Sequence, residues 1–246
     1  MSASDALQSF TGKYQAQWPE LSLLQGFLPE RCRPLASAWG ALLCELQDCA
    51  FAIEQEAVRT PKSLWWADEL QRMASRQARH PLTIALQDED AGYDRIAGPL
   101  LAVSAKVPLR AGNTEALHRQ LLPLTAALAG TEAALFGGGN GHDSTVIAVQ
   151  LLLMRLPGGL QAFDRAMVPM HLLARHQAME APTQKLSDDW LGELRALLPE
   201  QTAGNAYREA QRRFIRRRLS AMQSGKQPRL TPAYAWDAWR AVRRFR

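Results

Sequence analysis

The sequence has few cysteines and no long uninterrupted apolar run. Three cysteines, Cys32, Cys44 and Cys49, occur among 246 residues, and none belongs to a C-x-x-C pair. An odd number without that spacing argues against a disulfide framework or a zinc site, so we expect free thiols in a reducing cytoplasm. No apolar run reaches the roughly 18 residues of a membrane span. The chain also does not open on a basic and then apolar segment, so we expect neither a signal peptide nor a transmembrane helix.

Motifs of common hydrolases and nucleotide-binding proteins are missing as well. The sequence contains neither G-x-S-x-G nor H-E-x-x-H. The glycine-rich segment 137–141 lacks the G-K-[ST] ending of a phosphate-binding loop and therefore predicts a turn. The adjacent residues 142–144, His-Asp-Ser, cannot converge as a catalytic triad and predict a helix start instead. His171 and His176 would lie about 140° apart around a helix, a poor geometry for one metal ion.

Basic charge is concentrated at the carboxyl end. Residues 205–246 hold 12 of the 29 Lys and Arg residues but only 2 of the 24 Asp and Glu residues. The net charge of +5 therefore hides an acidic body and a strongly basic end. Such an end attracts phosphate groups, whether they belong to lipids, nucleic acid or a prenyl diphosphate.

The composition predicts helix along most of the chain, because Ala, Leu, Gln, Arg and Glu dominate and alternating β-branched runs are missing. We expect helices near residues 34–58, 62–78, 81–88, 93–105, 113–136, 143–156, 162–177, 187–198, 203–223 and 232–245. Residues 1–246 are predicted to form a single domain. It would carry an extended amino-terminal arm over about 1–25 and a basic helical end over about 205–246.

Capping residues agree with three of these helix starts. Thr60-Pro61 and Thr231-Pro232 each place a capping hydroxyl before a proline suited to the first turn. Ser187 would cap a helix whose first turn carries Asp188 and Asp189, where the helix dipole favours negative charge.

The last predicted helix combines tryptophan and arginine. The candidate membrane-contact residues are Trp236, Trp239, Arg240, Arg243 and Arg244. A helix with an aromatic stripe and arginines is typical of proteins that bind anionic lipid surfaces. The alternative is a terminal helix docked on its own domain with its arginines in solvent. No recognised nucleic-acid-binding motif supports the third possibility, a nucleic-acid contact.

Glu45 and Asp48 are the best candidates for a cation site. They lie one turn apart on one face of a predicted helix, so their oxygens could share a hard cation such as Mg²⁺. A single acidic pair binds Mg²⁺ weakly without further ligands, and the alternative is a partly exposed polar edge. Within 63–70, we expect at least one of Trp65 and Trp66 to pack in the core, and Asp68 and Glu69 to pair with Arg72 at the helix surface.

Several short segments resemble the squalene/phytoene synthase family, in the family's order. They are 27–34 with 41–46, 63–70 (SLWWADEL) with 80–86 (HPLTIAL), 148–155 (AVQLLLMR) and 168–173 (VPMHLL). The most specific is SLWWADEL followed by HPLTIAL, which is similar to the family's tryptophan helix and its "HP…AL" start. The segment 148–155 resembles the helix that carries the family's second aspartate motif. The resemblance spans roughly residues 25–178.

This resemblance implies an all-α, isoprenoid-synthase-type bundle of antiparallel helices around a central apolar cavity. In active members, acidic motifs on facing helices hold Mg²⁺, which helps diphosphate leave. Here Leu156 and Leu160 stand where the second motif would place its acids, and leucine cannot bind a cation. The resemblance makes the following residues candidates for the cavity or its ligand: Glu45, Asp48, Trp65, Gln150, Arg155 and Leu156.

We therefore expect a non-catalytic member of the family that needs no cofactor and binds an isoprenoid, a lipid or an assembly partner. It resembles a branch that has lost the same acids and includes a respiratory complex I assembly factor. One alternative is an active prenyltransferase that uses Mg²⁺ at Glu45, Asp48 and Glu54, with Arg31 or Arg155 on the diphosphate. Another is a scaffold that binds the inner face of the membrane through its basic end.

Overall fold

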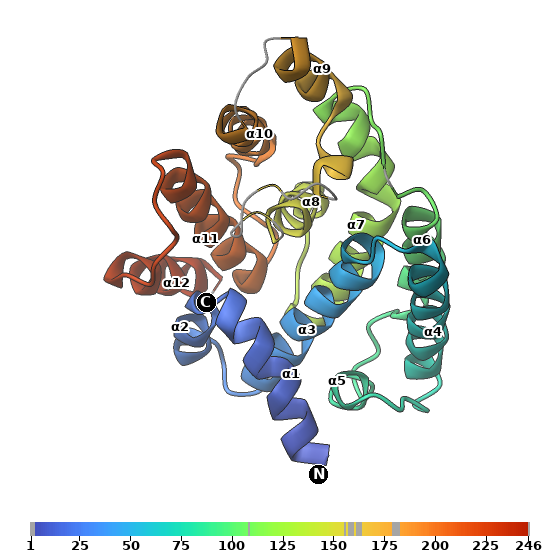
Figure 1. The fold of residues 1–246 in the computed structure, drawn as a ribbon. Helices are drawn as coiled ribbons and strands as arrows, with labels where there is room; N and C mark the ends of the chain where they lie inside the picture. Colours follow the sequence, from blue (N-terminus) through green and yellow to red (C-terminus); the bar gives the residue numbers. More distant parts are fainter. Residues whose placement is uncertain are drawn as a thin grey trace.

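The computed structural model describes residues 3–107, 109–154, 156, 160, 164–178 and 183–245, and it is helical throughout (Figure 1). The helices are α1 (Ala3–Gln17), α2 (Glu20–Phe27), α3 (Cys32–Gln47), α4 (Glu56–Ala74), α5 (Pro81–Ile84), α6 (Asp94–Ser104), α7 (Thr114–Phe136), α8 (Asp143–Leu153), α9 (Met170–Ala178), α10 (Thr183–Leu197), α11 (Ala206–Gln223) and α12 (Pro232–Arg244). A π-helix (Asp48–Ala52) extends α3, and a 3₁₀ turn (Asp164–Met167) precedes α9. The prediction of an all-α fold is confirmed.

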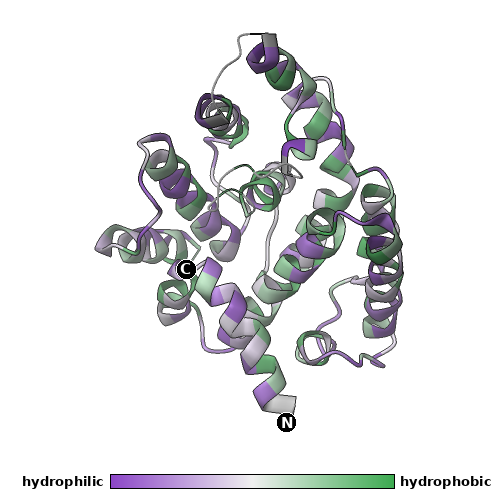
Figure 2. Cartoon of the chain, in the orientation of Figure 1, coloured by the Kyte–Doolittle hydropathy of each residue, from purple (hydrophilic) through white to green (hydrophobic). Residues whose placement is uncertain are grey.

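The helices pack around α8, which is buried along nearly its whole length. Figure 2 shows its apolar residues near the centre of the molecule, and it contacts α7 on one side and α11 and α10 on the other. Helices α4 and α6 pack against each other beside α7, whereas α12 packs on α11 and α2. The expected cavity at the centre of the bundle stays a prediction.

The amino-terminal segment is helical and packed, so the prediction of an extended arm is wrong. Tyr14, Trp18 and Leu21 are buried against the body. The Arg218 guanidinium of α11 lies over the Trp18 ring at 4.0 Å and donates to Glu20 Oε2 at 2.9 Å. Because buried aromatic surface and a shielded ion pair both hold it, this segment belongs to the core.

Two of the three helix starts that were predicted from capping residues are also wrong. Helix α4 begins at Glu56, so Pro61 lies inside it and Thr60 is not its cap. The reason is buried Arg59, whose guanidinium donates to the carbonyls of Ile53 at 2.8 Å and Ser104 at 3.1 Å. These bonds satisfy carbonyl groups at the ends of two neighbouring helices and stabilise the earlier start.

Near the carboxyl end, one predicted helix start is wrong and another is confirmed. Ser187 lies inside α10, which already begins at Thr183. The start at Thr231-Pro232 is confirmed, although the Thr231 side chain makes no capping hydrogen bond. There the fixed backbone of the proline is sufficient to set the first turn.

Gly40 marks a close approach between α1 and α3. A Cβ atom built on Gly40 would overlap the ring of Tyr14. We expect Gly40→Ala to lower the free energy of unfolding by about 1–3 kcal/mol, since the ring and α1 must move aside. Urea unfolding followed by circular dichroism measures the change.

The control is Gly130→Ala in α7, where a Cβ meets no atom within 4 Å. It should stabilise the protein by about 0.5–1 kcal/mol, because alanine restricts the unfolded chain. Equal effects of the two substitutions would contradict the packing of α1 on α3.

Candidate functional site

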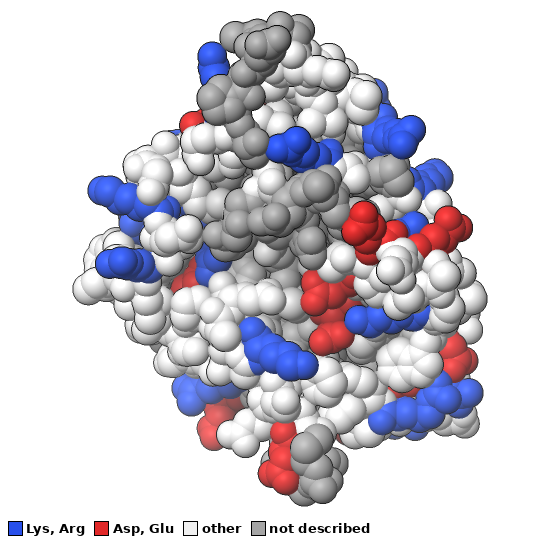
Figure 3. Space-filling view, viewed as in Figure 1, with Lys and Arg blue, Asp and Glu red and all other residues white. Residues whose placement is uncertain are grey.

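The acidic pair of α3 lies beside a cation. The Glu45 side chain is about one-fifth exposed, and Lys62 Nζ of α4 lies 3.9 Å from Glu45 Oε2. Burial, together with repulsion from Asp48, raises the pKa of the Glu45 carboxyl despite the attraction of Lys62. In Figure 3, acidic side chains gather near the middle of the face, over α3. The structure therefore brings Glu45 and Asp48 together, as predicted, but it adds a lysine that competes with any bound cation.

The neighbouring thiol is not a nucleophile. Cys44 is buried, and its Sγ donates to Gln17 Oε1 at 3.3 Å. Burial, reinforced by the negative charges of Asp48 and Glu45, raises the Cys44 pKa to about 12. Because a reactive cysteine needs thiolate near neutral pH, this cysteine serves the packing of α3 on α1.

The tryptophan pair divides between core and surface. Trp66 is buried, as expected for at least one ring, whereas Trp65 is 40% exposed. The two rings meet edge to face with centroids 5.0 Å apart, and both contact the His80 ring. Trp65 is thus a half-exposed ring that could touch a bound ligand, and its role as a ligand contact stays a prediction.

Glu69, three residues after Trp66, does not pair with Arg72 at the helix surface as predicted. Asp68 pairs with Arg72 at 2.9 Å as predicted, but Glu69 is fully buried and pairs instead with Arg79, whose Nε lies 3.3 Å from Glu69 Oε2. It accepts hydrogen bonds from the backbone N–H of His80 at 2.7 Å and from the Thr83 hydroxyl at 2.6 Å. Burial by itself would raise the Glu69 pKa. The hydrogen bonds from Thr83 and the backbone have the larger effect, so the pKa is lowered. Glu69 therefore fixes the turn before α5.

Gln150 belongs to a buried charged network that the sequence did not predict. Arg208 of α11 is fully buried and donates through Nε to Glu132 Oε2 of α7 at 2.7 Å. The same guanidinium donates to Gln150 Oε1 of α8, and Trp39 Nε1 of α3 donates to Glu132 Oε1 at 2.7 Å. One ion pair therefore joins α3, α7, α8 and α11.

Sequence reasoning missed this network because its members are far apart along the chain. Arg208 and Glu132 are separated by 76 residues, and Arg208 belongs to a run of basic residues that resembles a solvated surface. The only available signal was Glu132 itself, an acid within the apolar stretch that ends α7. Two further arginines of this basic run, Arg212 and Arg218, are also buried.

The remaining predicted positions follow α8. Leu156 and Leu160 are buried in the apolar core. Arg155 lies outside the described residues. Among the described residues, no three His, Cys, Asp or Glu side chains lie close enough together to hold a metal ion.

Helix α12 has an inner and an outer face. Tyr234, Ala238 and Val242 are buried where it packs on α2 and α11, so the docked terminal helix is confirmed. Trp236 is 55% exposed on the other side and stacks on Trp239 with centroids 4.7 Å apart.

Arginines accompany this aromatic pair. The Arg243 guanidinium lies 5.0 Å from the Trp239 ring centroid. Arg240 and Arg244 are exposed nearby on the same helix. No helix within the described ranges is long and apolar enough to cross a membrane. Contact of these five residues with a membrane surface stays a prediction.

Comparison with known proteins gives a weak similarity. No family model matches the sequence, and no curated protein matches it. Among solved structures, the chain is similar to squalene synthase HpnC from Alicyclobacillus acidocaldarius, with 15% identity and a TM-score of 0.49. That similarity covers 98% of this chain and 93% of the other. At this identity, the role of each residue must be argued from contacts within this chain.

Glu45→Gln is expected to raise the melting temperature at neutral pH. Because the folded-state pKa of Glu45 lies above its ordinary value of 4.5, ionisation of this carboxyl destabilises the folded chain. Stability falls as pH rises through the folded-state pKa. The stability gained by the Glu45→Gln substitution is therefore largest above the folded-state pKa and vanishes below the pKa of the unfolded chain.

Thermal unfolding at about pH 4 and about pH 7 tests this sign. Glu30→Gln, at an exposed position without an ion pair to any described residue, serves as control. A Glu45→Gln variant that is less stable than the parent at neutral pH would show that the pair with Lys62 outweighs burial.

Proposed function

We propose that this protein is a squalene/phytoene synthase-like helical protein that does not catalyse prenyl condensation. It would instead bind an isoprenoid, a lipid or an assembly partner. The observation that carries the proposal is the burial of Leu156 and Leu160 in the core, at positions where the resemblance places Mg²⁺-binding acids. A buried leucine offers no oxygen to a cation, and replacing an acid with it removes the charge that a diphosphate-bound Mg²⁺ requires.

The other polar groups near the bundle centre support the same conclusion. Glu132 has both oxygens engaged by Arg208 and Trp39, so it cannot ligate a metal without breaking these bonds. Glu45 faces Lys62. Since Mg²⁺ is held by carboxylates together with substrate phosphates, an acidic pair in which one carboxylate already faces an ammonium group is poorly suited to it.

Incubation with farnesyl or geranylgeranyl diphosphate and Mg²⁺ tests the proposal. We expect no C30 or C40 product by mass spectrometry, because the leaving diphosphate lacks a bound cation to neutralise it. Steady formation of such a product overturns the proposal. Its loss in a Glu45→Gln/Asp48→Asn variant, but not in Glu30→Gln, would then establish the alternative, an active prenyltransferase.

A second candidate function, binding of an anionic membrane surface, is favoured by the outer face of α12. Exposed Trp236 lies on α12 with exposed Arg240, and interfacial helices combine apolar insertion with basic charge in this way. Flotation with phosphatidylglycerol vesicles should weaken in Trp236→Ala. It should persist in Leu64→Ala, which removes an equally exposed apolar side chain from α4. Equal flotation of both variants contradicts this function.

A further inference from the structure

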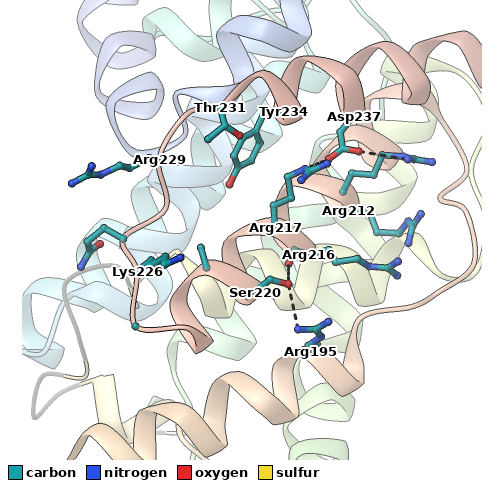
Figure 4. Close-up of a pocket in the computed structure, with 14 residues that line it drawn as sticks. Arg195, Arg212, Arg216, Arg217, Ser220, Lys226, Arg229, Thr231, Tyr234 and Asp237 are labelled. Atoms are coloured by element: carbon teal, nitrogen blue, oxygen red, sulfur yellow. Dashed lines mark hydrogen bonds and ion pairs between the residues drawn. The ribbon is translucent and has the colours of Figure 1, made fainter.

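A basic cleft lies outside the bundle core, between α10, α11 and the segment that leads from α11 into α12 (Figure 4). Its volume is about 1010 Å³, at the upper limit of the range of small-molecule sites. Seven Lys and Arg side chains and one carboxylate line it. The cleft is far larger than a single phosphate ion requires, so its charge could serve an extended anion.

Only part of this positive charge is balanced by the protein. Asp237 pairs with Arg217 and lies 3.7 Å from Arg213. Buried Glu209, just behind the cleft, accepts from Arg212 Nε at 2.8 Å and from Arg213 Nε at 2.6 Å. Two carboxylates are therefore shared among three arginines.

The other cations form no ion pair within the part of the chain that the structure describes. They are Arg195, Arg216, Lys226 and Arg229. Arg195 Nη1 instead donates to neutral partners, Ser220 Oγ at 3.2 Å and Gln223 Oε1 at 3.0 Å, which position the guanidinium without neutralising it. In Figure 4, the Arg229 side chain points away from the other arginines.

The excess positive charge acts on the guanidinium of Arg216. Burial lowers its pKa, and the positive charges of Arg212 and Arg195 act in the same direction. Glu200 and Glu209 oppose the shift without reversing it. Like charges held together in this way are stabilised by a bound anion.

The cleft also offers a hydrogen-bond donor. The Tyr234 hydroxyl points into the space beside Lys226 and Arg217 (Figure 4), and it has no hydrogen-bond partner within the described ranges. Arginine, lysine and tyrosine around one cleft provide the donors that phosphate oxygens accept from.

We propose that this cleft binds a ligand that carries two or more phosphate groups, held by Arg195, Arg216 and Lys226 with Tyr234 as a neutral donor. Arginine suits this role because its planar donors match phosphate oxygens. The ligand is either a soluble oligophosphate or the headgroup of a multiply phosphorylated lipid. The inference is independent of the proposed lack of catalysis, because it involves none of Glu45, Leu156 and Leu160.

Isothermal titration with inorganic tripolyphosphate at fixed ionic strength tests the site. Arg195→Gln/Arg216→Gln should weaken binding about 100-fold, because two charged hydrogen-bond donors are lost. Tyr234→Phe should weaken it about fivefold. Each variant is first checked for an unchanged circular dichroism spectrum.

Arg72→Gln/Arg119→Gln serves as control, because it removes the same net charge from exposed positions on α4 and α7. The control should bind like the parent. Absence of binding by the parent protein, or an equal loss in both double variants, overturns the site.

Vesicle sedimentation distinguishes the two sources of phosphate. Phosphatidylcholine vesicles containing a bisphosphorylated phosphoinositide are compared with vesicles of equal surface charge made with phosphatidylserine. A preference for the phosphorylated vesicles that is lost in Arg195→Gln/Arg216→Gln supports the lipid headgroup. No preference, together with tripolyphosphate binding, supports the soluble ligand, and a preference that survives in that variant overturns the site.

Discussion

Arg208 of α11 and Glu132 of α7 form an ion pair that is closed to solvent and reaches two further helices, α3 and α8. Removing both groups from water costs several kcal/mol per ion, and their attraction repays this only where every donor and acceptor is matched. Here Glu132 also accepts from Trp39, and Arg208 also donates to Gln150. Burial alone would lower the Arg208 pKa, but attraction to Glu132 outweighs it and the pKa is raised. The relative positions of α3, α7, α8 and α11 depend on this match.

Helix α11 uses its arginines on two sides, and the division explains why its basic run has two roles. Arg208 and Arg218 face inward, where each meets one glutamate, and Arg218 thereby ties α1 and α2 to the body. Arg216 is exposed beside Arg195 and forms no ion pair with any of the described residues. The inward side is neutral and structural, whereas the outward side retains charge for an anion. Since both sides belong to one helix, the basic cleft is positioned by the buried ion pair.

The sequence predicts what depends on local pattern and misses what depends on distant partners. Composition was enough for the all-α fold, and Thr231-Pro232 was enough for the start of α12. The packing of α1 could not be predicted, because its polar composition hides the approach of Tyr14 to Gly40. Glu69 was misplaced for a related reason: its partners are backbone N–H groups 10 or 11 residues away, which no side-chain pattern reveals. Within the candidate site, the spacing of Glu45 and Asp48 predicted that the two carboxylates lie together. It did not predict that Lys62 lies beside them.

A double-mutant cycle on the buried ion pair tests the account most directly. The variants are Glu132→Leu, Arg208→Leu and the combination of both, and the measurement is the free energy of unfolding from urea titration. Each single change should cost about 3–5 kcal/mol, because it leaves the partner charge buried and unpaired. The double variant should cost far less than the sum of the two. Additive effects, or single losses below about 1 kcal/mol, would contradict the claim that this pair organises the bundle.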